Sequence, residues 1–169
     1  MKKNKSLVPD YYFKRFSDAS AEFLLSIGVK GIVLDIDNTL EPYENPTPGE
    51  HVLSWFRELE AAGIKAVFVS NNGAERVELF NKELSLPAYY KAGKPFKKNV
   101  LRALADMNVP PEEAILMGDQ IFTDVWAARN AGIRAILVPP INDKRDLLTR
   151  FKRLLEKPII KKYKKRNNI

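Results

Sequence analysis

The chain has 169 residues, no cysteine and a single histidine, His51. The missing thiols exclude disulfides, thiolate metal sites and cysteine nucleophiles, and one histidine cannot build a multi-histidine zinc centre. Any chemistry therefore depends on carboxylates, hydroxyls, amides and lysines. We expect His51 on the exposed side of a helix and assign it no role.

The net charge of +7 is unevenly distributed. Residues 1–30 carry 6 basic and 3 acidic side chains, residues 31–140 carry 11 and 15, and residues 141–169 carry 11 and 3. The basic ends predict an anionic partner, either a membrane surface or nucleic acid. No apolar run reaches the roughly 20 residues of a membrane-spanning helix, and no signal peptide is recognisable. We expect a cytoplasmic protein whose basic ends allow peripheral contact with the inner membrane surface.

Apolar strands alternate with helical patterns in the middle of the chain. Strands are predicted over 32–37, 65–70, 88–92, 114–119 and 134–140, and helices over 48–63, 73–84, 95–108 and 123–131. This alternation predicts an α/β fold, a parallel sheet with helices on both faces. The whole chain, 1–169, is expected to form one domain.

Two segments flank this alternating region. Residues 10–27 are predicted to form an N-terminal helix that ends at Gly28. Residues 145–156 are predicted to form an amphipathic helix whose apolar face packs on the sheet. That face consists of Leu147, Leu148, Phe151, Leu154 and Leu155. Pro158 is expected to end the helix and leave a mobile basic tail over about 158–169, which either aids solubility or contacts a membrane.

Polar side chains follow four of the predicted strands. They are Asp35, Asp37, Asn38 and Thr39 after the first strand, Ser70 and Asn71 after the second, Lys94 after the third, and Asp119 and Asp124 after the fourth. Each group alone is a common turn or helix start. All four should converge, because ligands bind beyond the carboxyl ends of the strands in open parallel sheets.

The residue types in this set suit phosphoryl chemistry. Two carboxylates two residues apart share one side of a strand, and a third from a neighbouring strand completes an oxygen-rich pocket suited to Mg²⁺. A lysine adds positive charge beside a transferring phosphoryl group, and serine donates hydrogen bonds to its oxygens.

The four segments resemble the motifs of the haloacid dehalogenase (HAD) superfamily over roughly residues 31–140. DIDNTL (35–40) resembles the first motif, Ser70 the second, Lys94 the third and GDQIFTD (118–124) the fourth. The resemblance implies a Rossmann-like HAD fold and a phosphatase that forms an aspartyl-phosphate.

The resemblance also implies catalytic roles. Asp35 would be the nucleophile, and Asp37 would protonate the leaving oxygen and then activate water. Ser70 would hydrogen-bond the phosphoryl group, and Lys94 would neutralise it. Further candidates for substrate binding are Asn38, Thr39 and Asn71.

For the cofactor, the resemblance implies Mg²⁺. Asp35, Asp119 and the backbone carbonyl of Asp37 would hold the ion. Asp124 would orient either the water shell of the metal or Lys94.

The spacing between motifs leaves no room for a cap domain. One helix fits between Asp37 and Ser70, and one helix and one strand fit between Ser70 and Lys94. This is similar to the capless type III HAD phosphatases. The short length and basic ends further resemble the YqeG-like proteins, akin to phosphatidylglycerophosphate phosphatases, which implies a phosphorylated lipid substrate at a membrane surface.

Two alternatives stay open. One is a phosphatase for nucleic-acid ends or phosphoproteins, in which the basic ends hold a polyanion. The other is a non-enzymatic phospho-receiver, although such a switch has no need of a general acid like Asp37.

Overall fold

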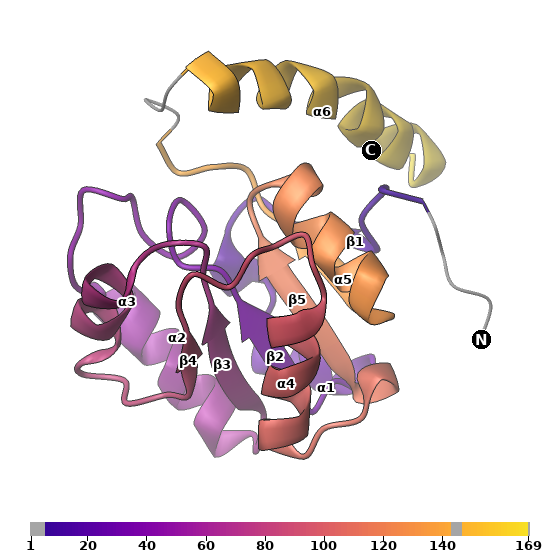
Figure 1. The fold of residues 1–169 in the computed structure, drawn as a ribbon. Helices are drawn as coiled ribbons and strands as arrows, with labels where there is room; N and C mark the ends of the chain where they lie inside the picture. The colour runs from indigo at the N-terminus through magenta and orange to yellow at the C-terminus, as the bar shows by residue number, and fades with distance from the viewer. Residues whose placement is uncertain (1–5, 143–146, 169) are drawn as a thin grey trace.

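The computed structural model describes residues 6–142 and 147–168, with Leu147, Leu148 and Arg150 described by their backbone alone. Its strands form one six-stranded sheet in the order β1-β6-β5-β2-β3-β4, and every neighbouring pair is parallel (Figure 1). The strands are β1 (Tyr11–Tyr12), β2 (Gly31–Leu34), β3 (Lys65–Val69), β4 (Ala88–Tyr89), β5 (Ala114–Gly118) and β6 (Arg134–Leu137). The predicted parallel α/β sheet is confirmed.

Helices cover both faces of the sheet, as predicted. Helices α1 (Ala21–Ser26), α2 (Glu50–Ala61) and α3 (Ala74–Asn81) lie on one face, and α4 (Lys98–Met107) and α5 (Trp126–Ala131) lie on the other. Alternate residues of a strand point to opposite faces. Leu34 of β2 therefore joins the cluster that contains Trp55 of α2, and its neighbour Val33 joins the cluster that contains Leu104 of α4.

The predicted N-terminal helix over 10–27 is wrong in its first half. The chain there adds β1 beside β6, and the carboxylate of Asp10 accepts a hydrogen bond of 2.7 Å from the backbone N–H of Ala135. A short turn, η1 (Phe16–Asp18), follows, and α1 begins only after its N-cap Ser20. The open edge of β6 offers backbone groups for pairing, and that tertiary pairing outweighs local helical preference.

The last helix, α6 (Leu147–Arg166), is longer than the predicted 145–156 and continues through Pro158. It lies across the edge of the sheet where the strands have their carboxyl ends (Figure 1). Pro158 removes one hydrogen bond from the helix, but it is exposed there. Beyond it, Tyr163 is buried and its hydroxyl accepts a hydrogen bond of 3.1 Å from the N–H of Tyr12. Residues 158–166 are therefore a docked helix and not the predicted mobile tail.

The apolar face of α6 does not pack on the sheet, which corrects a second expectation. Phe151, Leu154 and Leu155 are all exposed, whereas Leu147 and Leu148 lie outside the described side chains. The side of α6 that faces the molecule carries Arg153, Glu156, Ile159, Ile160 and Tyr163. Within the described ranges, no helix is long and apolar enough to cross a membrane.

The segments between the polar strand ends are as short as the sequence predicts. Residues 38–69 contain α2 and β3, and residues 71–93 contain α3 and β4. Both segments lie wholly within the described chain. The absence of a cap domain at these two positions is thus confirmed.

Candidate active site

The loop after β2 starts the site. The backbone N–H of Asp35 still donates to the carbonyl of Met117 on β5, over 3.0 Å. The chain then turns back, with Asn38 in the left-handed region (φ 62°) and its N–H donating to the carbonyl of Glu41 over 2.7 Å. Asparagine tolerates this backbone conformation better than most residues. The turn keeps Asp35 and Asp37 at the carboxyl edge of the sheet, where both are buried.

Lys94 joins two carboxylates from distant parts of the chain. Its Nζ donates to Asp35 Oδ1 over 2.8 Å and to Asp124 Oδ1 over 2.6 Å. Burial alone would lower the pKa of Lys94, but the adjacent carboxylates of Asp124 and Asp35 outweigh it and hold the pKa above its usual value. Lys94 therefore stays charged and forms a fixed cation beside Asp35.

Asn71 holds the backbone of Lys94 in place. Its Oδ1 accepts the N–H of Lys94 over 2.8 Å, and its Nδ2 donates to the carbonyl of Lys94 over 3.1 Å. Asn71 is a predicted substrate-binding residue, but its side-chain amide already contacts the Lys94 backbone through both ends. Asn71, in the loop after β3, thus orients Lys94, which lies in a different loop.

Asp119 and Asp124 follow β5. The chain enters a π-helical turn, η3 (Ile121–Val125), which brings Asp124 back over Gly118. The Oδ2 of Asp124 accepts the N–H of Gln120 over 3.0 Å and the hydroxyl of Thr123 over 3.2 Å. Gly118 is required here because a Cβ at this position would overlap with the Asp124 carboxyl group. Asp124 is thereby aimed at Lys94.

The carboxylates of Asp35, Asp119 and Asp124 form a cluster that fits a divalent cation. One oxygen from each lies within 4.8 Å of the others, and all three residues are buried. Thr39 lies between two of them, with its hydroxyl 3.3 Å from Asp35 Oδ2 and 3.5 Å from Asp119 Oδ1. Oxygen-only ligands of this kind are those that Mg²⁺ prefers. Asp37 is expected to contribute its backbone carbonyl, and its carboxylate is not one of the three in this cluster.

The electrostatics of the cluster also favour a cation. Burial raises the pKa of Asp119 to about 8, and although Arg153 opposes the rise, the nearby Asp35 and Asp124 add to it. Burial likewise raises the pKa of Asp124. Among the described residues, the three carboxylates of the cluster and the adjacent Glu156 are paired with only two cations, Lys94 and Arg153. A dication would balance this charge.

Asp37 faces away from the cluster toward α3. Its Oδ1 accepts from Arg76 Nε over 2.9 Å, and its Oδ2 accepts from the side-chain amide of Asn72. Arg76 also donates to the carbonyl of Pro46 over 2.9 Å. Arg76 is not among the site residues predicted from the sequence. Arg76 could have been suspected from its position, because it lies four residues after Asn72 in the first turn of the predicted helix over 73–84.

Ser70 and Asn38 also lie at this edge. Ser70 is buried, and its Oγ accepts the N–H of Asn72 over 3.1 Å, a contact that engages the oxygen and not the hydroxyl proton. That proton can be donated to a phosphoryl oxygen. Asn38 instead binds the segment after β6, because its Oδ1 accepts the N–H of Asn142 over 3.3 Å and its carbonyl accepts the N–H of Ile141 over 3.1 Å.

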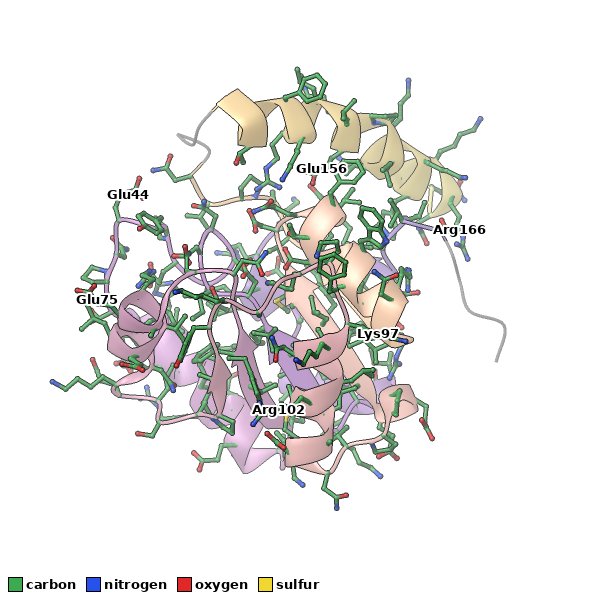
Figure 2. The ribbon with its side chains drawn as sticks, in the orientation of Figure 1. Glu44, Glu75, Lys97, Arg102, Glu156 and Arg166 are labelled. Carbon is green, nitrogen blue, oxygen red and sulfur yellow. The ribbon has the colours of Figure 1, made fainter. Side chains whose placement is uncertain are left out.

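Arg153 and Glu156 of α6 were also not predicted from the sequence as site residues. Arg153 donates to both the carboxylate and the backbone carbonyl of Asp119, and also to Glu156 over 3.1 Å. Glu156 Oε1 in turn accepts the N–H of Ile121 over 2.8 Å, and Figure 2 shows Glu156 on the side of α6 that faces the sheet. These contacts fix α6 directly to the cluster.

His51 lies outside the site. Its side chain is largely exposed, as expected, and its Nε2 is 3.3 Å from Glu41 Oε1. A hollow of about 450 Å³ near Phe56 and Leu84 also lies away from the site. It is lined by Lys65 at the start of β3, whereas Ser70 of the site follows the opposite end of that strand. The described cluster at the carboxyl edge thus remains the candidate active site.

Comparison with known proteins identifies the superfamily. The chain is 37% identical over 165 residues to the protein named "Probable phosphatase YqeG" of Bacillus subtilis, an alignment that covers 98% of this chain and 96% of the relative. Residues 91–154 match the HAD-hydrolase-like family. The chain belongs to the haloacid dehalogenase-like hydrolases. Within that superfamily it is a phosphatase.

A shorter match and two solved structures are also similar to this chain. A phospholysine phosphohistidine inorganic pyrophosphate phosphatase of Xenopus laevis is 36% identical over 87 residues, which are 44% of this chain and 32% of that protein. An uncharacterised Listeria monocytogenes protein superimposes with a TM-score of 0.55 at 17% identity, covering 76% of this chain and 99% of that one. CbbY from Rhodobacter sphaeroides in complex with phosphate superimposes with a TM-score of 0.54 at 15% identity. The alignment covers 70% of this chain and 89% of that one. Both structures share the fold of this chain.

Proposed function

We propose that this HAD phosphatase is a Mg²⁺-dependent phosphomonoester hydrolase that works through an aspartyl-phosphate on Asp35. The observation that carries the proposal is the position of Lys94 between Asp35 and Asp124, beside the Asp35, Asp119 and Asp124 cluster. A carboxylate nucleophile with a fixed cation next to it suits attack on an anionic phosphoryl group.

In the first half of the reaction, a carboxylate oxygen of Asp35 attacks the phosphorus. The new O–P bond forms as the bond between phosphorus and the leaving alkoxide breaks. Asp37, which accepts from Arg76 and Asn72 in this structure, turns toward the site in this step and donates a proton to that leaving oxygen, so an alcohol departs. Lys94 offsets the charge of the phosphoryl group, and the Ser70 hydroxyl donates to one of its oxygens.

In the second half, the aspartyl-phosphate is hydrolysed. Asp37, now a carboxylate, removes a proton from a water molecule as the water oxygen attacks the phosphorus. The bond between phosphorus and Asp35 breaks, and inorganic phosphate leaves. Asp35 regains its carboxylate, and Asp37 is again protonated for the next turnover.

For Mg²⁺, the residues that fit are Asp35 and Asp119, with Asp124 in the same carboxylate cluster and the backbone carbonyl of Asp37 as a further oxygen. When bound, the ion supplies positive charge that offsets the repulsion between the carboxylates and the phosphoryl group. The hydroxyl of Thr39 lies between the carboxylates of Asp35 and Asp119 and helps to hold them in place.

The substrate in this proposal is phosphatidylglycerophosphate, reached by a protein held at the cytoplasmic face of an anionic membrane. The resemblance to the YqeG-like proteins supports this choice, as does the absence of a cap in the described segments that follow β2 and β3. The basic residues of α6 provide attraction to an anionic surface. A phosphatase for nucleic-acid ends or phosphoproteins is the alternative, and HAD hydrolase membership argues against a non-enzymatic receiver.

The intermediate can be tested by trapping. Wild-type protein mixed with Mg²⁺ and a ³²P-labelled phosphomonoester, then quenched in acid, should retain label that hydroxylamine releases. Asp35→Asn should retain none, while Glu78→Gln, at an exposed position of α3, should behave as wild type. Label that persists in folded Asp35→Asn would exclude Asp35 as the nucleophile.

The substrate class can be tested by a screen. Phosphatidylglycerophosphate in mixed micelles, 5′-phosphorylated oligonucleotides and phosphopeptides are compared by kcat/KM at the same Mg²⁺ concentration. The proposal expects the lipid to have the highest value. A higher value for oligonucleotides or phosphopeptides would replace the lipid by that class.

A further inference from the structure

Helix α6 is fixed to the protein by polar contacts on one side only. Arg153 binds Asp119, Glu156 accepts the N–H of Ile121, and Tyr163 accepts the N–H of Tyr12. These three α6 residues recur at spacings of three and seven, so they lie on the same side of the helix. The opposite side of α6 is therefore turned away from the sheet.

That outer side begins with an apolar stripe. Phe151 is 58% exposed, Leu154 57% and Leu155 48%, and Pro158 is exposed next to them. Their spacings of three, four and seven place them on one face of the helix. Single exposed apolar residues are common on proteins, but a contiguous helical stripe indicates a surface that binds something.

The same outer side continues as a basic cluster. Lys161, Lys162 and Lys165 follow Pro158 at three, four and seven residues, and all three are exposed. The whole helix contains nine basic residues and one acidic residue, a net charge of +8. The outer side of α6 thus has an apolar half, Phe151 to Pro158, and a cationic half, Lys161 to Lys165.

This combination selects among possible partners. A second copy of the chain would bring two helices of charge +8 together, which is electrostatically unfavourable. Nucleic acid would satisfy the lysines but leave Phe151, Leu154 and Leu155 in water. An anionic lipid surface satisfies both halves, because aliphatic side chains enter the acyl boundary while lysines contact headgroup phosphates.

We propose that the outer side of α6 is an interfacial lipid-docking surface that lies in the plane of an anionic bilayer. Amphipathic helices of this kind bury their apolar face about 5–10 Å into the headgroup and acyl boundary. Because the inner side of α6 contacts Asp119, only about one helix diameter, on the order of 10 Å, separates the lipid from the cluster. Docking turns the carboxyl edge of the sheet toward the membrane.

Lipid docking is a binding property and stands apart from the chemistry, while its use in reaching a lipid substrate rests on the proposed function. The chain has no native cysteine, so Leu154→Cys gives one attachment point for an environment-sensitive fluorophore. Leu79→Cys, at a 43% exposed apolar position of α3, is the matched control. Vesicles of phosphatidylglycerol should shift the emission of the Leu154 label to shorter wavelength and leave the Leu79 label unchanged.

A second experiment measures affinity. Phe151→Ser combined with Leu154→Ser should weaken binding to phosphatidylglycerol vesicles by about tenfold or more, equivalent to about 1.4 kcal/mol. The control pair, Leu79→Ser with Leu101→Ser, removes two exposed apolar side chains elsewhere and should change binding little. Hydrolysis of a soluble phosphomonoester should be the same in both variants and wild type.

Other results would contradict either the docking surface or the proposed function, and the two cases are distinguishable. Equal vesicle binding by the Phe151 and Leu154 double variant, or an unshifted Leu154 label, would remove the docking surface. Binding of oligonucleotides without binding of vesicles would assign α6 to nucleic acid, and a wild-type dimer that the double variant dissociates would assign it to a second copy. Vesicle binding without any phosphatase activity would sink the proposed function and leave the docking surface intact.

Discussion

The guanidinium of Arg153 contacts both the carboxylate and the backbone carbonyl of Asp119. The two residues are 34 positions apart in the sequence and come from α6 and the end of β5. Arg153 thus joins α6 to a carboxylate of the cluster. Loss of the guanidinium would leave the buried carboxylates of Asp119 and Glu156 without their ion-pair partner Arg153.

Arg153→Gln should therefore lower the free energy of unfolding by about 3 kcal/mol, the size expected when one partner of a buried ion pair is removed. Urea denaturation measures the change. Arg57→Gln is the control, because its pair with Glu50 is exposed and should contribute less than about 1 kcal/mol. Arg153→Lys, which keeps the charge, should fall between. Similar losses for Arg153→Gln and Arg57→Gln would mean that the contact with Asp119 adds little.

Asp119→Asn should weaken Mg²⁺ binding by about tenfold or more, because a charged oxygen ligand becomes a neutral one. Isothermal titration calorimetry measures the affinity directly, without reference to activity. Glu78→Gln provides the matched control at an exposed site. Chelation of the metal should also abolish wild-type hydrolysis, and full activity in excess EDTA would refute the magnesium proposal.

Gly118→Ala should destabilise the protein by about 3 kcal/mol, since an added methyl group in a fully packed site typically costs 1–3 kcal/mol and here also displaces Asp124 from Lys94. Gly73→Ala is the control, because a Cβ at Gly73 meets no atom within 4 Å and its φ is not positive. Thermal unfolding followed by circular dichroism compares the two. If both variants unfold at the same temperature, the close approach of Asp124 does not require glycine at position 118.

The basic half of α6 should supply the salt-dependent part of membrane binding. Deleting residues 158–169 would not test this cleanly, because it also removes the buried Tyr163. Lys161→Gln, Lys162→Gln and Lys165→Gln together keep the fold and should reduce affinity for anionic vesicles by about 3 kcal/mol at low salt, at about 1 kcal/mol per lysine. Sedimentation with vesicles at several salt concentrations measures it. An affinity that stays constant would limit the role of these lysines to solubility.

The sequence was most informative where strands are buried on both faces. Apolar runs such as 32–37 and 114–119 are readable because a parallel sheet covered by helices requires them. The polar residues that interrupt each run therefore stand out at the strand ends. Asp35, Lys94 and Asp124 could be expected together for this reason, and the structure brings them into contact.

Contacts made by segments outside that pattern were not predictable. Residues 10–12 have no local strand signal, and they pair with β6 because its edge is open. Helix α6 was predicted to bury its apolar side, since burial of apolar surface is the usual rule. Instead, buried pairing of Arg153 and Glu156 sets its orientation. Such pairing depends on which residues lie across the gap, and a single sequence does not show this.

The pairing of β1 with β6 also bears on how the protein is made. The second strand of the chain takes a central place in the sheet, whereas the first waits for a partner that is synthesised more than a hundred residues later. Tyr12 also donates its backbone N–H to the hydroxyl of Tyr163 on α6, which follows β6 in the chain. A nascent chain on the ribosome consequently holds Tyr11 and Tyr12 without their sheet partner until β6 has been synthesised.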